Sequence, residues 1–293
     1  MITSAERLRR TLQQNELIIA PGAFDCLSAK AVEIAGFPAL YMTGMGTSAS
    51  RLGLPDYGLA TMTEMVSNAH AISAAVQVPV IADADTGYGN ELNMTRTIHE
   101  YERSGAAGVH IEDQVFPKRC GHLGGKQVIP RQEYIRKIAA AVEARRDPDF
   151  VIIARTDANA VIGFEEAIAR ANAALDVGAD LALVEAPEDI EQMAEVPERV
   201  HGPCVLNVLI GGKSPLAPLA QVEEMGYRMV LLSDAMLGAA VHAYDSMMER
   251  VKRTTETLRF DQRFTPQELF KRLGSERWDA LRPEVEDAET VSR

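Results

Sequence analysis

One short segment of the chain places a thiol among basic side chains. Residues 118–126 read Lys-Arg-Cys-Gly-His-Leu-Gly-Gly-Lys, so Cys120 follows two cations and precedes His122 by two positions. Cations close to a thiol favour the thiolate and lower its pKa, as proton transfer by a cysteine requires. The glycines disfavour helix and strand, so we expect a loop, and a surface loop with an incidental cysteine is the alternative.

Acidic side chains end two apolar, strand-like runs upstream of this loop. Asp83 and Asp85 end one run, and Glu112 and Asp113 end the other. Residues i and i+2 of an extended segment share a face, and crowded carboxylates raise one another's pKa unless a cation intervenes. A few oxygen ligands suit Mg²⁺ or Mn²⁺. We therefore expect Asp83, Asp85 and Glu112 to bind a divalent cation, whereas helix capping is an equal alternative for Asp113 and Asp157.

Two further polar side chains follow later apolar runs. Arg155 carries a planar guanidinium, which suits a substrate carboxylate, although it could simply neutralise Glu185. Asn207 can hydrogen-bond a second carboxylate or a hydroxyl, or cap a loop. A dication, an arginine and an acidic thiol together suit carbon–carbon cleavage of a 2-hydroxy dicarboxylic acid. The metal would polarise the 2-oxygen and stabilise an enolate, and the thiol would exchange a proton at the neighbouring carbon.

Composition indicates the class of protein. The chain has 293 residues, of which 46% are apolar and 25% charged, values that are ordinary for a soluble globular protein. Its net charge of −12 argues against a general nucleic-acid binder. No apolar run is long enough for a membrane span, and the polar amino terminus does not resemble a signal peptide. Three scattered cysteines fit a reducing compartment, so we expect a cytoplasmic enzyme.

Eight apolar runs alternate with helix-period segments along the chain. The runs span 17–21, 39–43, 80–83, 108–112, 150–155, 180–185, 204–208 and 229–232. The helical segments span 26–35, 63–76, 91–104, 131–145, 164–177, 190–196, 216–225 and 236–258. This α/β alternation, with continuous apolar strands, predicts a parallel (β/α)₈ TIM barrel. In such barrels the chemistry lies at the carboxyl ends of the strands, where the polar residues above occur.

A doubly wound nucleotide-binding sheet is the competing fold. Residues 44–49 imitate a G-x-G-x-x-A fingerprint, which must open a helix. Gly53, Pro55 and Gly58 follow too soon for that helix, and two phosphate-loop lookalikes at 125–126 and 212–214 lack required residues. We therefore expect no nucleotide. Beyond the last long helix, residues 265–268 read as a helix start, and the final acidic residues read as disordered.

Seven short motifs along the chain indicate a protein family. They lie at residues 41–44, 52–56, 83–89, 108–114, 118–122, 154–157 and 184–186. With them the chain resembles the isocitrate lyase/phosphoenolpyruvate mutase superfamily over most of its length. The resemblance implies a catalytic barrel domain over 1–258 and a C-terminal helical extension over 259–293. It also implies that the last long helix is exchanged between subunits of a homo-oligomer, usually a tetramer.

The resemblance also implies roles for individual residues. Asp83, Asp85 and Glu112 would bind Mg²⁺, with Mn²⁺ as a possible substitute. Cys120 would be the general acid that protonates the departing enolate, and Tyr41 would interact with the 2-hydroxyl proton. The catalytic candidates are Cys120, Tyr41, His122 and Lys118. The substrate-binding candidates are Thr43, Gly44, Met45, Asp56, Gly121, Arg155, Glu185 and Asn207, with Asp56 acting indirectly.

Departures from the family patterns indicate which branch of the superfamily the chain resembles. Cys120 favours the carbon–carbon lyases and oxaloacetate hydrolase, because the phosphonopyruvate branch lacks a cysteine there. Methylisocitrate lyases carry an arginine where this chain has Gly238, and a different stretch at 209–212. We therefore expect a lyase acting on a 2-hydroxy dicarboxylate of the 2-alkylmalate or dimethylmalate type. The alternatives are 2-methylisocitrate lyase, oxaloacetate hydrolase and a non-catalytic small-acid-binding barrel.

Overall fold

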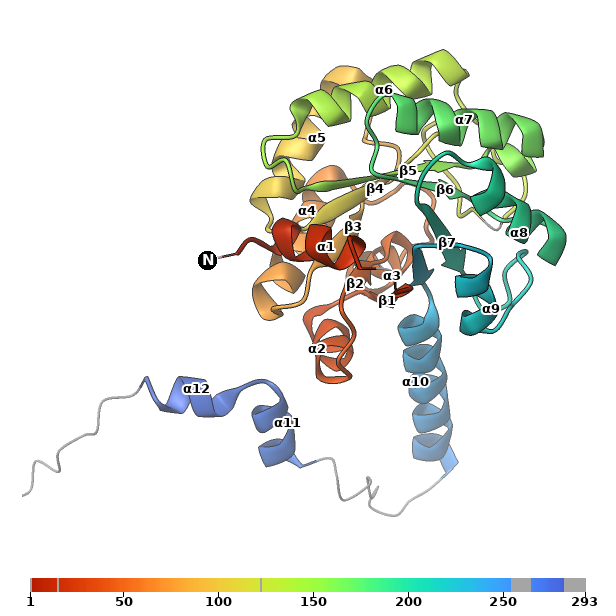
Figure 1. Ribbon diagram of the computed structural model, residues 1–293. Helices are drawn as coiled ribbons and strands as arrows, with labels where there is room; N and C mark the ends of the chain where they lie inside the picture. Colours follow the sequence, from red (N-terminus) through yellow and green to blue (C-terminus); the bar gives the residue numbers. More distant parts are fainter. Residues whose placement is uncertain (1, 15, 122, 254–264, 282–293) are drawn as a thin grey trace, which may run out of the picture. The chain divides into compact units, whose positions relative to one another are not determined.

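Eight parallel strands close into a barrel in the computed structural model, which describes residues 2–14, 16–121, 123–253 and 265–281 (Figure 1). Each strand pairs with the next along the chain, and β8 pairs with β1. The strands are β1 Ile18–Ala23, β2 Leu40–Met42, β3 Val80–Asp83, β4 Gly108–Glu112, β5 Val151–Thr156, β6 Leu181–Val184, β7 Cys204–Val208 and β8 Met229–Leu232. The predicted TIM barrel is confirmed, and the doubly wound alternative is wrong.

Helix α1 precedes the first strand, α2 to α9 lie in the connections between strands, and α10 follows the last strand (Figure 1). The bounds are α1 Ser4–Leu12, α2 Cys26–Ile34, α3 Gly44–Thr47, α4 Met62–Ala75, α5 Glu91–Arg103, α6 Arg131–Ala144, α7 Phe164–Asp176, α8 Ile190–Arg199, α9 Leu219–Glu224 and α10 Ala235–Arg253. A π-helical turn η1 spans Ser48–Leu52 and a 3₁₀ turn η2 spans Ala158–Ala160. Asp25, Thr61 and Asn90 begin α2, α4 and α5 with capping boxes, which satisfy backbone N–H groups that lack a partner inside the helix.

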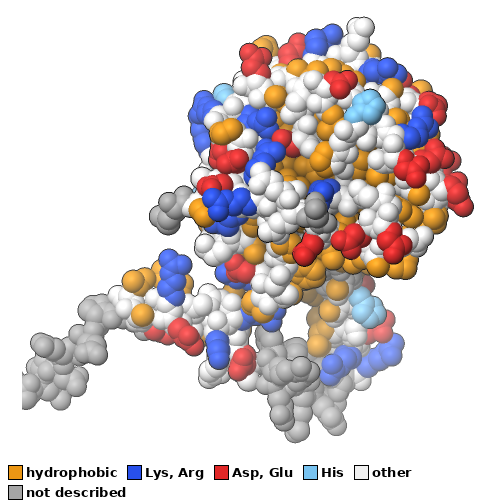
Figure 2. Space-filling view, in the orientation of Figure 1, with side chains coloured by type: hydrophobic (Ala, Val, Ile, Leu, Met, Phe, Trp, Pro, Cys, Tyr) orange, Lys and Arg blue, Asp and Glu red, His pale blue; other side chains and the backbone are white. Residues whose placement is uncertain are grey.

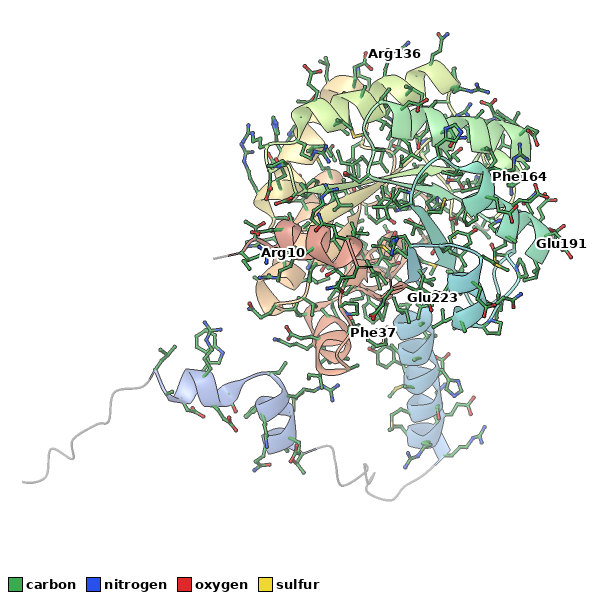
Figure 3. The ribbon with its side chains drawn as sticks, in the orientation of Figure 1. Arg10, Phe37, Arg136, Phe164, Glu191 and Glu223 are labelled. Carbon is green, nitrogen blue, oxygen red and sulfur yellow. The ribbon has the colours of Figure 1, made fainter. Side chains whose placement is uncertain are left out.

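Alternate residues of each strand face the two sides of the barrel wall. Ile81, Ile153 and Leu183 belong to an interior cluster that Leu8 of α1 also joins. Val80 and Ala82 instead belong to a cluster between the sheet and the covering helices. The outer faces of those helices are polar: Figure 3 shows Arg136 on α6 and Glu191 on α8 pointing away from the barrel. The two-sided burial explains why the strands read as continuous apolar runs.

The structure differs from the sequence predictions at three local points. A helical turn does open at Gly44, because the Thr43 side chain accepts from the N–H of Gly46 and so caps it, and η1 follows. Helix α8 continues through Pro197 to Arg199 instead of ending at residue 196. Helix α9 begins only after Pro218, so the predicted start at residue 216 is too early.

The chain forms two compact units, Met1–Val241 and His242–Arg293, so α10 contains the boundary. In the second unit, α11 (Pro266–Arg272) begins as predicted, with the Thr265 side chain accepting from the N–H of Glu268. A short helix α12 follows at Ser275–Asp279. The predicted end of the long helix at 258, the start of the extension at 259 and the acidic tail lie outside the described residues.

Charged side chains of both signs are interspersed over the visible face of the first unit (Figure 2). Acidic side chains outnumber basic ones in the sequence as a whole, which gives the net charge of −12. Among the residues the structure describes, no helix is both long and apolar enough to cross a bilayer.

Candidate active site

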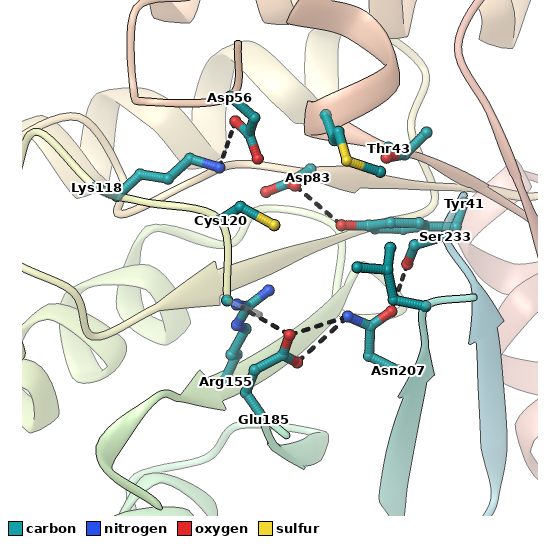
Figure 4. Close-up of a pocket in the computed structure, with 13 residues that line it drawn as sticks. Tyr41, Thr43, Asp56, Asp83, Lys118, Cys120, Arg155, Glu185, Asn207 and Ser233 are labelled. Atoms are coloured by element: carbon teal, nitrogen blue, oxygen red, sulfur yellow. Dashed lines mark hydrogen bonds and ion pairs between the residues drawn. The ribbon is translucent and has the colours of Figure 1, made fainter. Parts of the chain in front are cut away.

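A pocket lies at the carboxyl ends of the strands, where the sequence placed the chemistry (Figure 4). Its lining consists of Tyr41, Thr43, Met45, Asp56, Asp83, Lys118, Cys120, Gly121, Arg155, Glu185, Asn207, Leu209 and Ser233. All but Leu209 and Ser233 are predicted site residues. The predicted residues Gly44, Asp85 and Glu112 are buried beside this lining rather than in it. His122 lies outside the described residues.

Strand alternation explains why these side chains converge. Ile81 of β3 fills the barrel interior, so Asp83, two residues on, also points inward. The same spacing carries Arg155 inward beyond Ile153 on β5. Cross-strand register then pairs Glu112 of β4 with Arg155 of β5. The pocket thus collects the last inward-facing residue of several neighbouring strands.

Asp83 is the most extensively hydrogen-bonded of the predicted metal ligands. Its carboxylate accepts from the Tyr41 hydroxyl at 2.9 Å, the Gly44 N–H at 3.1 Å and the Asp85 N–H at 2.9 Å. Burial alone would raise the pKa of Asp83, but a hydrogen bond from His110 and the charge of Lys118 outweigh it, so the pKa falls. Burial and the nearby Asp83 raise the pKa of Tyr41 well above its ordinary value. Asp83 is therefore ionised and Tyr41 protonated at neutral pH.

Lys118 contacts two further carboxylates of the site. Its Nζ is 2.6 Å from Oδ1 of Asp56 and 3.0 Å from Oδ1 of Asp85. Burial opposes the charge of Lys118, yet Asp85 and Asp56 raise its pKa well above the ordinary value. Burial, with a contribution from the charges of Asp83 and Asp56, raises the pKa of Asp85 to about 7, although the charge of Lys118 lowers it. The site therefore carries more buried negative charge than its lysine offsets.

Arg155 organises the opposite side of the pocket (Figure 4). Its Nε donates to Oδ2 of Asp157 at 2.8 Å, and its Nη2 is 3.2 Å from Oε1 of Glu185. The Asn207 amide donates to Glu185 at 3.1 Å, and the Ser233 hydroxyl donates to the Asn207 carbonyl. This chain of contacts fixes the orientation of the guanidinium and the amide before substrate arrives. The Asp157 side chain makes no capping bond to η2, and its carboxylate binds Arg155 instead.

Asp113 turns away from the pocket. Its carboxylate accepts from the Thr156 hydroxyl at 2.6 Å, the Asp157 N–H at 2.8 Å and Arg170 at 3.0 Å. Burial and the charge of Asp157 raise the pKa of Asp113 to about 6. Asp113 thus joins β4, β5 and α7 rather than capping a helix or touching the pocket.

The loop after β4 brings Cys120 to the pocket. Gln114 holds this loop from within: its amide donates to the Arg119 carbonyl at 2.8 Å and accepts from the Arg119 N–H at 3.0 Å. The Cys120 side chain points into the pocket (Figure 4). A Cβ on Gly121 would overlap the side chains of Arg155 and Glu185, so glycine permits the close approach of the loop backbone.

The chain is similar to known proteins over most of its length. The model of the phosphoenolpyruvate phosphomutase family matches residues 8–252. The chain belongs to the phosphoenolpyruvate mutase/isocitrate lyase superfamily. The 2,3-dimethylmalate lyase of Eubacterium barkeri is 44% identical over 256 residues, which cover 87% of this chain and 89% of that protein.

Two further members of the superfamily are similar along nearly the whole chain. The 2-methylisocitrate lyase of Aeropyrum pernix is 38% identical over 279 residues, which cover 95% of this chain and 90% of that protein. A solved structure of oxaloacetate acetylhydrolase with the inhibitor 3,3-difluorooxalacetate is 42% identical, has a TM-score of 0.92 and is matched over 95% of each chain. The expectation of an enzyme is confirmed by membership of this superfamily.

Superfamily members typically depend on Mg²⁺, and the residues of this chain can be tested for their fit to that ion. Oε1 of Glu112 is buried and accepts no hydrogen bond from any described residue, and burial raises the pKa of Glu112 well above its ordinary value. A buried carboxylate oxygen without a donor suits a hard cation. In the described part of the chain, however, no three His, Cys, Asp or Glu side chains lie close enough together to hold an ion. The carboxylate oxygens of Asp83, Asp85 and Glu112 are the kind of ligand that Mg²⁺ prefers, so their chemistry fits the ion. In this structure Asp85 contacts Lys118 and Glu112 contacts Arg155.

Leu209 and Ser233 are the lining residues that sequence reasoning missed, and Ser233 is the polar one. It follows β8 directly, and Met229 and Leu231 of that strand face the barrel interior, so residue 233 continues the inward-facing series. The sequence does contain a hydroxyl two residues beyond Leu231. That hydroxyl could be assigned to the pocket only once the inward-facing residues of β8 were known.

Proposed function

We propose that the chain is a Mg²⁺-dependent carbon–carbon lyase that cleaves a 2-hydroxy dicarboxylate of the 2-alkylmalate or dimethylmalate type into a 2-oxo acid and a carboxylic acid. Cys120, Arg155 and Asp83 all line one pocket, and this arrangement is the observation that carries the proposal. The similarity to the 2,3-dimethylmalate lyase of Eubacterium barkeri supports the substrate class.

The binding roles follow from the arrangement of the pocket. We assign the carboxylate beside the 2-carbon to Thr43, Gly44 and Met45, with Arg155 across from them. Asn207 and Glu185 orient the far end of the substrate, since they form one hydrogen-bonded unit with Arg155. Gly121 brings the loop backbone against that unit, and Asp56 acts indirectly by holding Lys118.

The proton transfers can be assigned to two sides of the pocket. Tyr41 accepts the proton of the 2-hydroxyl while its own hydroxyl proton passes to the Asp83 carboxylate, to which it is hydrogen-bonded. Bound Mg²⁺, held by Asp83, Asp85 and Glu112, would supply a charge that stabilises the 2-oxygen anion and the enolate. The bond between carbons 2 and 3 breaks, and its electron pair goes to the fragment that contains carbon 3. Cys120 then gives its proton to that carbon. Lys118 and His122 would set the charge around the thiol.

Product identification tests this proposal directly. The protein with Mg²⁺ would be offered separate 2-hydroxy dicarboxylates, including 2,3-dimethylmalate and 2-methylisocitrate, and oxaloacetate. The proposal predicts fastest release of a 2-oxo acid from the alkylmalates. Methylisocitrate as the best substrate would overturn the substrate class, and no turnover of any compound would favour a non-catalytic acid-binding barrel.

Hydrolysis of oxaloacetate is a second candidate function that one observation favours. The pocket contains the Ser233 hydroxyl beside Asn207, and a hydrated 2-oxo acid presents two hydroxyls at its 2-carbon where an alkylmalate presents one. The solved oxaloacetate acetylhydrolase structure supports the same candidate. Release of oxalate from oxaloacetate, lost in Ser233→Ala while alkylmalate cleavage persists, would establish it.

We also propose a cytoplasmic homo-oligomer, a tetramer in which α10 is exchanged between subunits. The exposed side chains Tyr244, Met248 and Val251 recur at intervals of four and three residues along α10, which places them on one face. An apolar face on a helix is expected to pack against another surface. Light scattering coupled to size exclusion tests the proposal; a monomer at micromolar concentration contradicts it.

A further inference from the structure

Lys126 ends the same loop segment that carries Cys120, and its ammonium is buried. Only 8% of the residue is exposed. Its Nζ donates to the Gly121 carbonyl and, at 2.6 Å, to Oδ1 of Asp157. A buried lysine is costly unless its charge is paired, so these two contacts account for its position. The first contact lies within the loop, and the second ties the loop to the residue that follows β5.

Asp157 transmits this contact to the substrate side of the pocket. The same carboxylate accepts from Nε of Arg155 at 2.8 Å, and its backbone N–H donates to Asp113 at 2.8 Å. Burial alone would raise the pKa of Asp157, but Arg155 and Lys126 lower it below its ordinary value, so the carboxylate is ionised and binds both cations. One anion therefore joins the arginine of the pocket to the lysine of the loop.

Gly121 is held from both sides by this arrangement. Its carbonyl accepts from Lys126, while its α-carbon packs so tightly against Arg155 and Glu185 that a Cβ would overlap both. The residue before it is Cys120. A shift of Gly121 would therefore move the thiol relative to the bound carboxylate.

We propose that Lys126 is a positioning residue that latches the Cys120 loop onto the Asp157–Arg155 pair and so sets the distance between the thiol and the substrate. Lys126 does not itself line the pocket. Its effect on turnover rests on the proposed lyase function, whereas its effect on the loop does not.

The first test measures the loop without using turnover. Amide hydrogen exchange of peptides from 114–128 would be compared in wild type, Lys126→Met and Lys126→Arg. Lys137→Met is the matched control, because Lys137 is also buried but lies on α6 outside the pocket. We expect exchange at least about tenfold faster in the loop of Lys126→Met alone, with barrel peptides unchanged. Unchanged loop exchange, or loss of protection throughout the barrel, overturns the latch.

The second test separates positioning from binding. With the best substrate, kcat of Lys126→Met should fall by about 10²-fold while KM changes less than about threefold, because the thiol is misplaced but Arg155 still binds the carboxylate. Lys126→Arg, which keeps a cation for Asp157, should recover most of kcat, and Lys137→Met should match wild type. A rise in KM with unchanged kcat, or no recovery in Lys126→Arg, contradicts the proposal. If wild type turns over no substrate, the proposed function fails and hydrogen exchange alone decides the latch.

Discussion

Replacing Gly121 with alanine perturbs the loop at its closest approach to the pocket. The added carbon would overlap Nη2 of Arg155 and Oε1 of Glu185, and would lie 2.9 Å from Cγ of Glu185, where ordinary contact begins at 3.4 Å. Neither neighbour can move away cheaply, because Asp157 holds Arg155 and Asn207 holds Glu185. The loop must therefore retreat.

The size of the effect follows from that retreat. A displacement of about 1 Å at a reacting group costs about 10²-fold in rate, which corresponds to about 2.7 kcal/mol. The Gly121 backbone does not have a positive φ, so alanine adds no backbone strain there. We therefore expect Gly121→Ala to lower kcat about 10²-fold with its thermal midpoint nearly unchanged.

Gly124→Ala is the matched control in the same loop. A Cβ at Gly124 would meet nothing within 4 Å, and its φ is not positive either. Steady-state kinetics and thermal unfolding of both variants against wild type give the comparison. Gly121→Ala with kcat within threefold of wild type, or an equal loss in both variants, would refute the reasoning.

Three further outcomes follow from the structure. Tyr41→Phe should lower kcat about 10²-fold, since it removes a hydrogen-bond donor that Asp83 orients, and a rate equal to wild type would exclude that role. Treatment with EDTA should abolish turnover and Mg²⁺ should restore it, because Oε1 of Glu112 is buried and accepts no hydrogen bond from the described residues. Turnover that survives chelation counts against a metal. The hydrogen bond from Arg131 lowers the pKa of Glu166 from 4.5 to about 2, so this pair stabilises the fold fully above pH 4.5 and loses its effect as pH falls towards 2. Glu166→Gln should therefore lower the thermal midpoint at pH 7, and the difference from wild type should close over that acid range; a difference independent of pH would be inconsistent with the pair.

The sequence predicted the barrel because its signals are local. The apolar runs that became β3 and β5 are each followed by a helix-period segment, which is alanine-rich after β5. The same locality placed Asp83 and Arg155 at strand ends, where a barrel gathers chemistry. Their meeting in one pocket followed from the fold and needed no knowledge of individual contacts.

What the sequence could not predict depends on contacts between distant segments. Because both faces of the strands are buried, β8 shows no polar alternation that marks Ser233 as inward-facing. Lys126 stands beside two glycines and resembles a solvated loop cation until the fold brings Asp157 within 2.6 Å. The turn that opens at Gly44 contradicts intrinsic glycine propensity and depends on Thr43 and on Asn68, which donates to Thr47.

The central claim is that sulfur delivers the proton to the departing fragment. The measurement that tests it most directly is kcat of Cys120→Ser, with pyruvate and oxalate affinity determined by calorimetry on the same preparation. We predict a loss of about 10²–10⁴-fold in kcat with both affinities retained, because the hydroxyl fits the site but holds its proton more tightly. Turnover at the wild-type rate, with the ligands still bound, would contradict the assignment.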